Sequence, residues 1–177
     1  MFFRVDKRDF KVSEIIPPNP ENYQDTANFS NDKKIIESIF EENKPDHICS
    51  RRDCLFLFQE LYDAIKFWIK LKGGKLYLVE VEEADFILKS DMIYTEIIKN
   101  LTLPQNIDEA KEIVKKYWSG GLPTFKNCWE VMVRKAKVIK LLCVDEEVRL
   151  NSKKQYSKLI VEDIDIYRNI LFDLYKK

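Results

Sequence analysis

The sequence has little of several residue types on which common protein chemistries depend. It contains one histidine among 177 residues, which argues against zinc sites built from several histidines. Its four glycines stand in two pairs, at 73–74 and 120–121, and neither pair forms a Walker-type loop or a Gly-rich dinucleotide fingerprint. No two cysteines have the CxxC spacing of a zinc ribbon or a thioredoxin motif.

Marks of secretion and of membrane insertion are also missing. The chain has enough apolar residues, 45%, to fold without disulfides. We therefore expect reduced thiols at Cys49, Cys54, Cys128 and Cys143. Charged residues begin at Arg4, directly after the first three residues of the chain. No apolar run approaches the roughly 18 residues of a membrane-spanning helix. These features predict a cytoplasmic protein without a membrane partner, acting in its own cell or delivered into another one as an effector.

Net charge is absent too, since 30 basic residues balance 30 acidic ones. A balanced chain is not typical of proteins that mainly grip nucleic-acid phosphates, although a local basic patch remains compatible with it. At about 150 residues per domain, the length predicts one domain with a sizeable core.

The apolar pattern predicts helices and strands in separate groups, which is typical of the α+β class. We expect strands over 2–5, 75–81, 86–88, 128–133 and 136–144, and helices over 31–43, 53–71, 92–99, 108–117 and 152–175. The intervening segments 6–30 and 119–125 are expected to be loops. The two late strands meet near Lys135, which favours an antiparallel pair.

An arginine interrupts the apolar run at the start of the chain. Strand alternation places Arg4 on the same face as Phe2. Arg4 is then either an edge residue that points into solvent or an inward guanidinium that holds an anion, for which its planar shape is suited.

Basic residues stand before the second predicted helix. Ser50 or Asp53 can cap that helix, which alone explains the serine. Arg51 and Arg52 at the positive end of a helix are unfavourable, unless the site also holds an anion.

A glutamate lies within the apolar strand sequence WEVMV. If Met132 faces the interior, alternation turns Glu130 inward as well, where a carboxylate needs a partner. If Trp129 and Val131 form the buried face, Glu130 points to water, and the pattern favours this second interpretation.

Taken in order, Arg4, Ser50 and Glu130 resemble the Arg…Ser…Glu signature of the ADP-ribosyltransferase superfamily, in its cholera-toxin-like branch. FFRVDKR is similar to the opening strand of that class, CSRR with the following KLYLVEV to its serine-bearing region, and NCWEVMV to the strand of its catalytic glutamate. The resemblance implies one domain over 1–144, with split, mostly antiparallel sheets and flanking helices. A C-terminal helical extension over 145–177 would pack on the same domain.

The resemblance also implies an enzyme that cleaves the nicotinamide–ribose bond of NAD and passes ADP-ribose to an acceptor. Glu130 would stabilise the charge that develops on the ribose, Ser50 would orient it, and Arg4 would contact the phosphate or ribose. No metal would take part. The residues implied in NAD binding are Arg4, Ser50, Arg51, Tyr62 and Trp118.

One departure from the family pattern leaves alternatives open. Arginine-modifying members carry a second glutamate where this chain has Cys128. The acceptor is therefore open among a protein, a nucleic acid, a small molecule and water alone, and the oligomeric state is open as well. A catalytically degenerate member that binds a protein partner is the alternative function. A transferase of the related RNA 2′-phosphate type is a third one.

Overall fold

The fold is taken from a computed structural model, which describes residues 1–19, 31–71, 74–101, 105–120, 128–143 and 151. The chain divides into two compact units. Unit 1 comprises Met1–Ile15, Phe58–Glu80 and Lys137–Lys177, and unit 2 comprises Ile16–Leu57 and Val81–Ala136.

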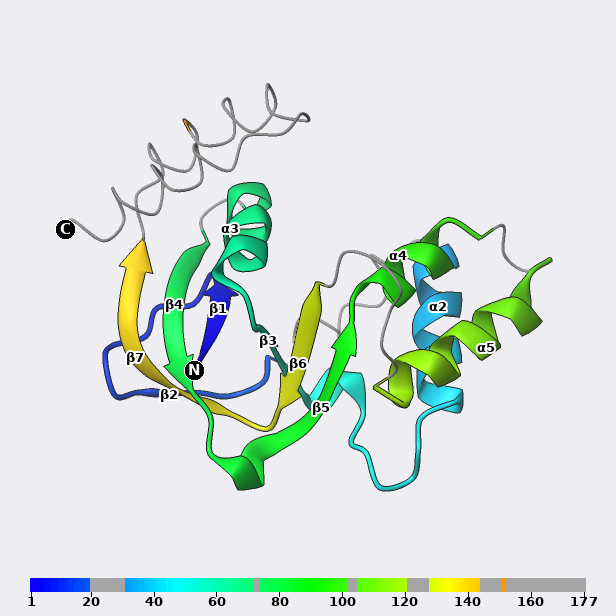
Figure 1. The fold of residues 1–177 in the computed structure, drawn as a ribbon, viewed down its shortest axis with the longest axis horizontal. Helices are drawn as coiled ribbons and strands as arrows, with labels where there is room; N and C mark the ends of the chain where they lie inside the picture. Colours follow the sequence, from blue (N-terminus) through cyan, green and yellow to red (C-terminus); the bar gives the residue numbers. More distant parts are fainter. Residues whose placement is uncertain (20–30, 72–73, 102–104, 121–127, 144–150, 152–177) are drawn as a thin grey trace. The chain divides into compact units, whose positions relative to one another are not determined.

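As far as the structure describes it, unit 1 is built on antiparallel strands with one helix against them (Figure 1). Strand β1 (Phe2–Asp6) pairs with β4 (Lys75–Glu80), and β4 pairs on its other side with β7 (Ala136–Cys143). The short β2 (Ile15–Ile16) follows β1, and the backbone before it bonds to Val138 of β7. Helix α3 (Leu61–Lys70) lies beside β1 and β4.

Helix α3 forms because its apolar residues recur at helical spacing. Ala64, Ile65, Trp68 and Ile69 are all at most 2% exposed and share the face turned to the strands. The Trp68 indole donates a hydrogen bond to the Gly74 carbonyl at 2.8 Å, which ties α3 to the residue that precedes β4.

Among its described residues, unit 2 combines three strands with three helices that lie together beside β5 (Figure 1). Its strand order is β3–β6–β5, and β5 pairs antiparallel with β6. Its elements are α2 (Asn31–Glu42), the 3₁₀ turn η2 (Arg51–Asp53), β3 (Leu55–Phe58), the 3₁₀ turn η3 (Glu83–Asp85), β5 (Phe86–Asp91), α4 (Ile93–Lys99), α5 (Ile107–Trp118) and β6 (Trp129–Val133).

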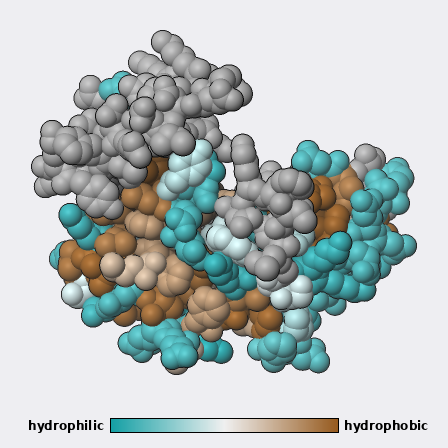
Figure 2. Space-filling view, in the orientation of Figure 1, coloured by the Kyte–Doolittle hydropathy of each residue, from teal (hydrophilic) through white to brown (hydrophobic). Residues whose placement is uncertain are grey.

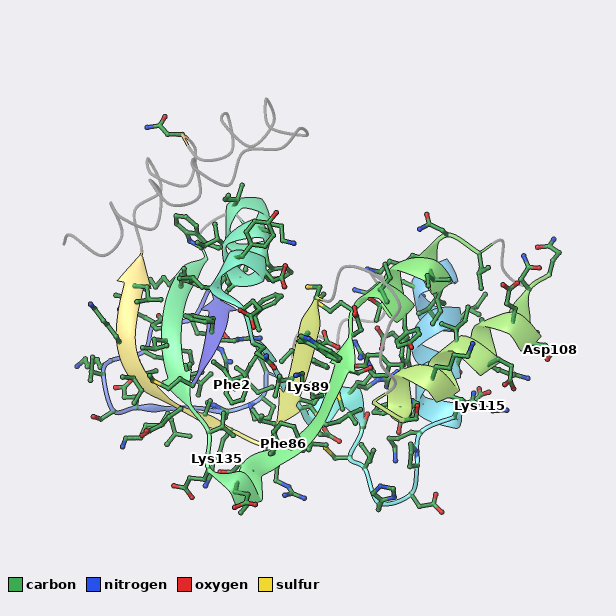
Figure 3. The ribbon with its side chains drawn as sticks, in the orientation of Figure 1. Phe2, Phe86, Lys89, Asp108, Lys115 and Lys135 are labelled. Atoms are coloured by element: carbon green, nitrogen blue, oxygen red, sulfur yellow. The ribbon has the colours of Figure 1, made fainter. Side chains whose placement is uncertain are left out.

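Helix α5 shows how the core of unit 2 is closed. Its buried face carries Ala110, Ile113, Val114, Tyr117 and Trp118. Its opposite side is hydrophilic (Figure 2), and Asp108 and Lys115 project outward from it (Figure 3). Gly120, at φ +66°, supplies the left-handed residue that ends the helix directly after Tyr117 and Trp118.

The structure confirms the α+β class, because it combines helices with mostly antiparallel strands. Helices α2, α4 and α5 and strands β1, β4 and β5 lie where the sequence pattern predicts them. The expected loop after β1 also contains β2. The expected loop over 121–125 and, apart from residue 151, the expected C-terminal helical extension lie outside the described residues. Within the described part of the chain, no helix has both the length and the apolar character to cross a membrane.

The prediction of one helix from Asp53 to Leu71 is wrong in its first half. Residues Leu55–Phe58 form β3, and α3 begins only at Leu61. A run of four large apolar residues fits a buried strand as well as a buried helix, so periodicity does not separate the two.

The predicted antiparallel pair of 128–133 with 136–144 is also wrong. In the strand order β6 lies between β3 and β5, whereas β7 lies between β2 and β4. The link between them does not reverse as a hairpin turn. Instead, the Arg134 amide donates to the Asp85 carbonyl at 2.8 Å, so the chain keeps contact with the start of β5 as it leaves β6.

Candidate functional site

The turn η2 determines which way its two arginines point. Ser50 caps the turn, because its hydroxyl accepts the Arg52 amide at 3.2 Å while its carbonyl accepts the Asp53 amide at 3.0 Å. This backbone path leaves Arg52 exposed and directs Arg51 into unit 2, where it is 8% exposed.

The Arg51 guanidinium lies among aromatic rings. Its central carbon is 4.6 Å from the Phe40 ring centre, 4.8 Å from that of Phe56 and 5.0 Å from that of Tyr117. Guanidinium groups are attracted to aromatic faces, and the attraction strengthens where water is excluded. Arg51 is thus held by rings from α2, β3 and α5.

A carboxylate completes this buried site. Oε2 of Glu130, on β6, accepts hydrogen bonds from Nη1 of Arg51 at 3.1 Å and from the Tyr117 hydroxyl at 2.5 Å. Arg51 Nη1 also donates to the Tyr117 oxygen. Within the described part of the chain, Oε1 of Glu130 has no hydrogen-bond partner. We call these three residues the Arg51–Tyr117–Glu130 cluster.

The interpretation in which Glu130 points to water is wrong, because Glu130 is 8% exposed. Both faces of β6 are covered, and Val131, Met132 and Val133 are each at most 1% exposed. Alternation assigns faces only where one face of a strand meets solvent, so it does not apply to this strand. The inward alternative for Glu130 is confirmed.

Ser50 belongs to the same unit but has a different partner. Its hydroxyl donates to Oε2 of Glu41 on α2 at 2.7 Å. In the part of the chain that the structure describes, the side chain that contacts Glu130 from this turn is that of Arg51, not Ser50. Oε2 of Glu37, on α2, lies 3.9 Å from Nε of Arg51.

Arg4 belongs to unit 1 and forms an ion pair with Asp6. Nη2 of Arg4 lies 2.8 Å and Nη2 of Arg8 lies 2.9 Å from Oδ2 of Asp6, which is 5% exposed. Burial raises the pKa of Asp6, but the hydrogen bonds of Arg8 and the charge of Arg4 outweigh it and lower this pKa from 3.8 to about 2.

This ion cluster predicts the acid sensitivity of unit 1. Because the pKa of Asp6 is lower in the folded protein, ionised Asp6 stabilises the fold. This contribution to the free energy of unfolding is complete above pH 4 and is lost as the pH falls through about 2. Asp6→Asn should therefore lower the free energy of unfolding by roughly 2 kcal/mol at neutral pH, and the difference from wild type should shrink below pH 4. Urea denaturation at several pH values measures this.

The matched control for Asp6 is Asp108→Asn, since the Asp108 side chain is 96% exposed. It should change stability by less than about 0.5 kcal/mol at every pH. A deficit of Asp6→Asn that stays constant from pH 7 to pH 2.5 would contradict the assigned origin of its stabilising effect.

The two aromatic residues implied in NAD binding differ in exposure. Trp118 is 3% exposed, and its indole donates to the Phe40 carbonyl at 2.9 Å, which places it in the packed core of unit 2. Tyr62 is 46% exposed on α3 of unit 1, with Nζ of Lys66 4.3 Å from its ring centre. Tyr62 is thus partly exposed, whereas Trp118 is buried.

Sequence reasoning missed Tyr117 and Asp6 as site residues. Tyr117 follows Ala110 and Val114 on the apolar stripe of its helix, and a buried tyrosine hydroxyl needs a partner. Asp6 is spaced by two residues from Arg4 and from Arg8, which places all three on one face of an extended chain. Both signals are visible in the sequence.

No protein-family model matches this chain, and no curated protein matches it. The resemblance to ADP-ribosyltransferases therefore stays a hypothesis that rests on residues of the chain itself. Among the described residues, no group of three or more His, Cys, Asp and Glu side chains is placed to hold a metal ion.

Proposed function

We propose that this chain is an ADP-ribosyltransferase-like enzyme that cleaves the nicotinamide–ribose bond of NAD, with Glu130 as its catalytic carboxylate. The observation that carries the proposal is the position and hydrogen bonding of that carboxylate. It is inward, one oxygen is fixed by Arg51 and Tyr117, and the other has no partner among the described residues.

The chemistry requires a carboxylate of this kind. As nicotinamide leaves, positive charge develops on the ribose, and a preorganised negative group shielded from water stabilises that charge strongly. Fixing Oε2 through two hydrogen bonds aims Oε1 without further loss of side-chain entropy. Arg51 and Tyr117 would be the positioning residues for Glu130.

The remaining roles in the proposal follow the family resemblance. Arg4 would contact the phosphate or ribose of NAD, and Ser50 would shape the nicotinamide pocket, together with Tyr62. The family's split-sheet arrangement over residues 1–144 is part of the same proposal. ADP-ribose would pass to a protein, a nucleic acid, a small molecule or water.

The experiment is to incubate the full chain with NAD and to quantify released nicotinamide by chromatography, with the melting midpoint followed over an NAD titration. Saturable nicotinamide release and a midpoint that rises with NAD concentration are expected. The absence of both nicotinamide release and a midpoint shift at millimolar NAD would overturn the proposal.

A specific observation favours a second candidate, a catalytically degenerate member that acts as a protein-binding module. The positive charge of Arg51 lies 3.1 Å from Glu130 and weakens the negative charge that would stabilise the ribose cation. The Ser50 hydroxyl is hydrogen-bonded to Glu41 instead of Glu130. Such a module would give no heat of NAD binding in calorimetry and would form a stable complex with a protein partner. Calorimetric NAD binding would argue against it.

A further inference from the structure

Two cysteines stand on either side of the turn η2. The Sγ atoms of Cys49 and Cys54 lie 2.8 Å apart and share a thiol hydrogen bond. A disulfide bond measures about 2.05 Å, so the two sulfurs are already within about 0.8 Å of that separation. The structure therefore brings together two side chains that are five positions apart in the sequence and aims them at one another.

The two thiols differ in access to solvent. Cys54 is 4% exposed, and its thiol also donates to the Ser50 carbonyl at 3.1 Å. Cys49 is only partly buried. Burial, followed by the contact with Cys49, raises the pKa of the Cys54 thiol. Cys49 is accordingly the thiol that a reagent from solvent meets first.

We propose that Cys49 and Cys54 form a reversible disulfide in the folded protein by exchange with a low-molecular-weight disulfide such as oxidised glutathione. The bridge would enclose Ser50 to Asp53 and thereby lock the turn that directs Arg51 against Glu130. This modification site does not depend on the proposed reaction with NAD.

The exchange balances in two steps. The Cys49 thiolate attacks one sulfur of oxidised glutathione, which forms a mixed disulfide and releases one glutathione thiolate. The Cys54 sulfur then attacks Sγ of Cys49, which forms the Cys49–Cys54 bond and releases the second glutathione thiolate. The two cysteine protons end on the two released thiolates. The cysteine pair loses two electrons, and the glutathione disulfide gains them.

The test uses the full chain in buffers of stepped oxidised-to-reduced glutathione ratio, with free thiols then blocked and the protein digested by trypsin without reduction. Trypsin cleaves after Arg51 and Arg52, between the two cysteines, so peptides 35–51 and 53–66 stay joined only through the bridge. We expect this linked pair to appear with oxidation and to disappear with dithiothreitol. Tryptic cleavage of the native protein at Arg52 should slow on the order of tenfold in the bridged form.

Cys128→Ser is the matched control, because the Cys128 sulfur lies near Met92, 3.6 Å from its Sδ, and the linked pair should persist in this variant. Cys49→Ser and Cys49→Ala should both remove the linked pair of peptides and the protection from trypsin. Two different substitutions are used so that a folding defect in one of them does not decide the result. Oxidised wild type that carries only glutathione adducts, or a bridge to Cys128, would overturn the proposal.

Discussion

Glu130→Gln is expected to lower nicotinamide release from NAD by about 10²–10³-fold, the range measured when one preorganised electrostatic group is removed from an active site. Glutamine keeps the size of the side chain and an oxygen that accepts from Arg51 and Tyr117. It removes the negative charge that would oppose the positive charge on the ribose. Because that charge develops only in the transition state, kcat should fall while KM changes little. Initial rates over a range of NAD concentrations separate the two.

A carboxylate on the surface of the same unit provides the control. Glu112 lies on α5, and its side chain is 67% exposed in an ion pair with Lys115. Glu112→Gln makes the same chemical change away from the cluster and should leave turnover within about twofold of wild type. The melting midpoint of both variants shows that they are folded under the assay conditions. Wild-type turnover in folded Glu130→Gln would remove Glu130 from the reaction.

The elements that the sequence predicted correctly are those with a clear boundary signal, such as glycine, or a regular apolar pattern. Strand β4 follows a glycine pair and consists of β-prone residues, and α5 carries a regular apolar stripe that stops before Gly120. These signals are local, so they do not depend on which other elements pack nearby. Strand β3 has no glycine or proline at its start, so the apolar pattern does not separate its residues from the helix that follows.

The Arg51–Tyr117–Glu130 cluster was predictable only in part. Glu130 is conspicuous, because a charge among apolar residues is expensive without a partner. Arg51 is conspicuous because a basic residue is unfavourable at the positive end of a predicted helix. Which partner each one has depends on three elements that are distant in sequence, namely η2, α5 and β6. Pairings of this kind follow from the packing of the fold, and strand alternation failed because β6 is covered on both faces.

Arg51→Met is expected to lower the free energy of unfolding by about 3–5 kcal/mol, as when one partner of a buried ion pair is removed. Methionine has similar length and fills the space among Phe40, Phe56 and Tyr117, so lost volume contributes little. The loss comes from Glu130, which keeps its burial and gives up the guanidinium 3.1 Å away. Urea denaturation of wild type and variant measures the difference in unfolding free energy.

Two further variants decide whether the effect arises from the ion pair. Arg52→Met changes the neighbouring exposed arginine and should cost less than about 0.5 kcal/mol. The double variant Arg51→Met with Glu130→Gln removes both charges, so it should be less destabilised than the sum of the single variants by roughly 1–3 kcal/mol. Strictly additive single effects, or Arg51→Met as stable as Arg52→Met, would show that the buried pair does not hold Glu130 in place. In that case Glu130 would have to be positioned by Tyr117 alone, since the phenol is the other group that donates to its Oε2 among the described residues.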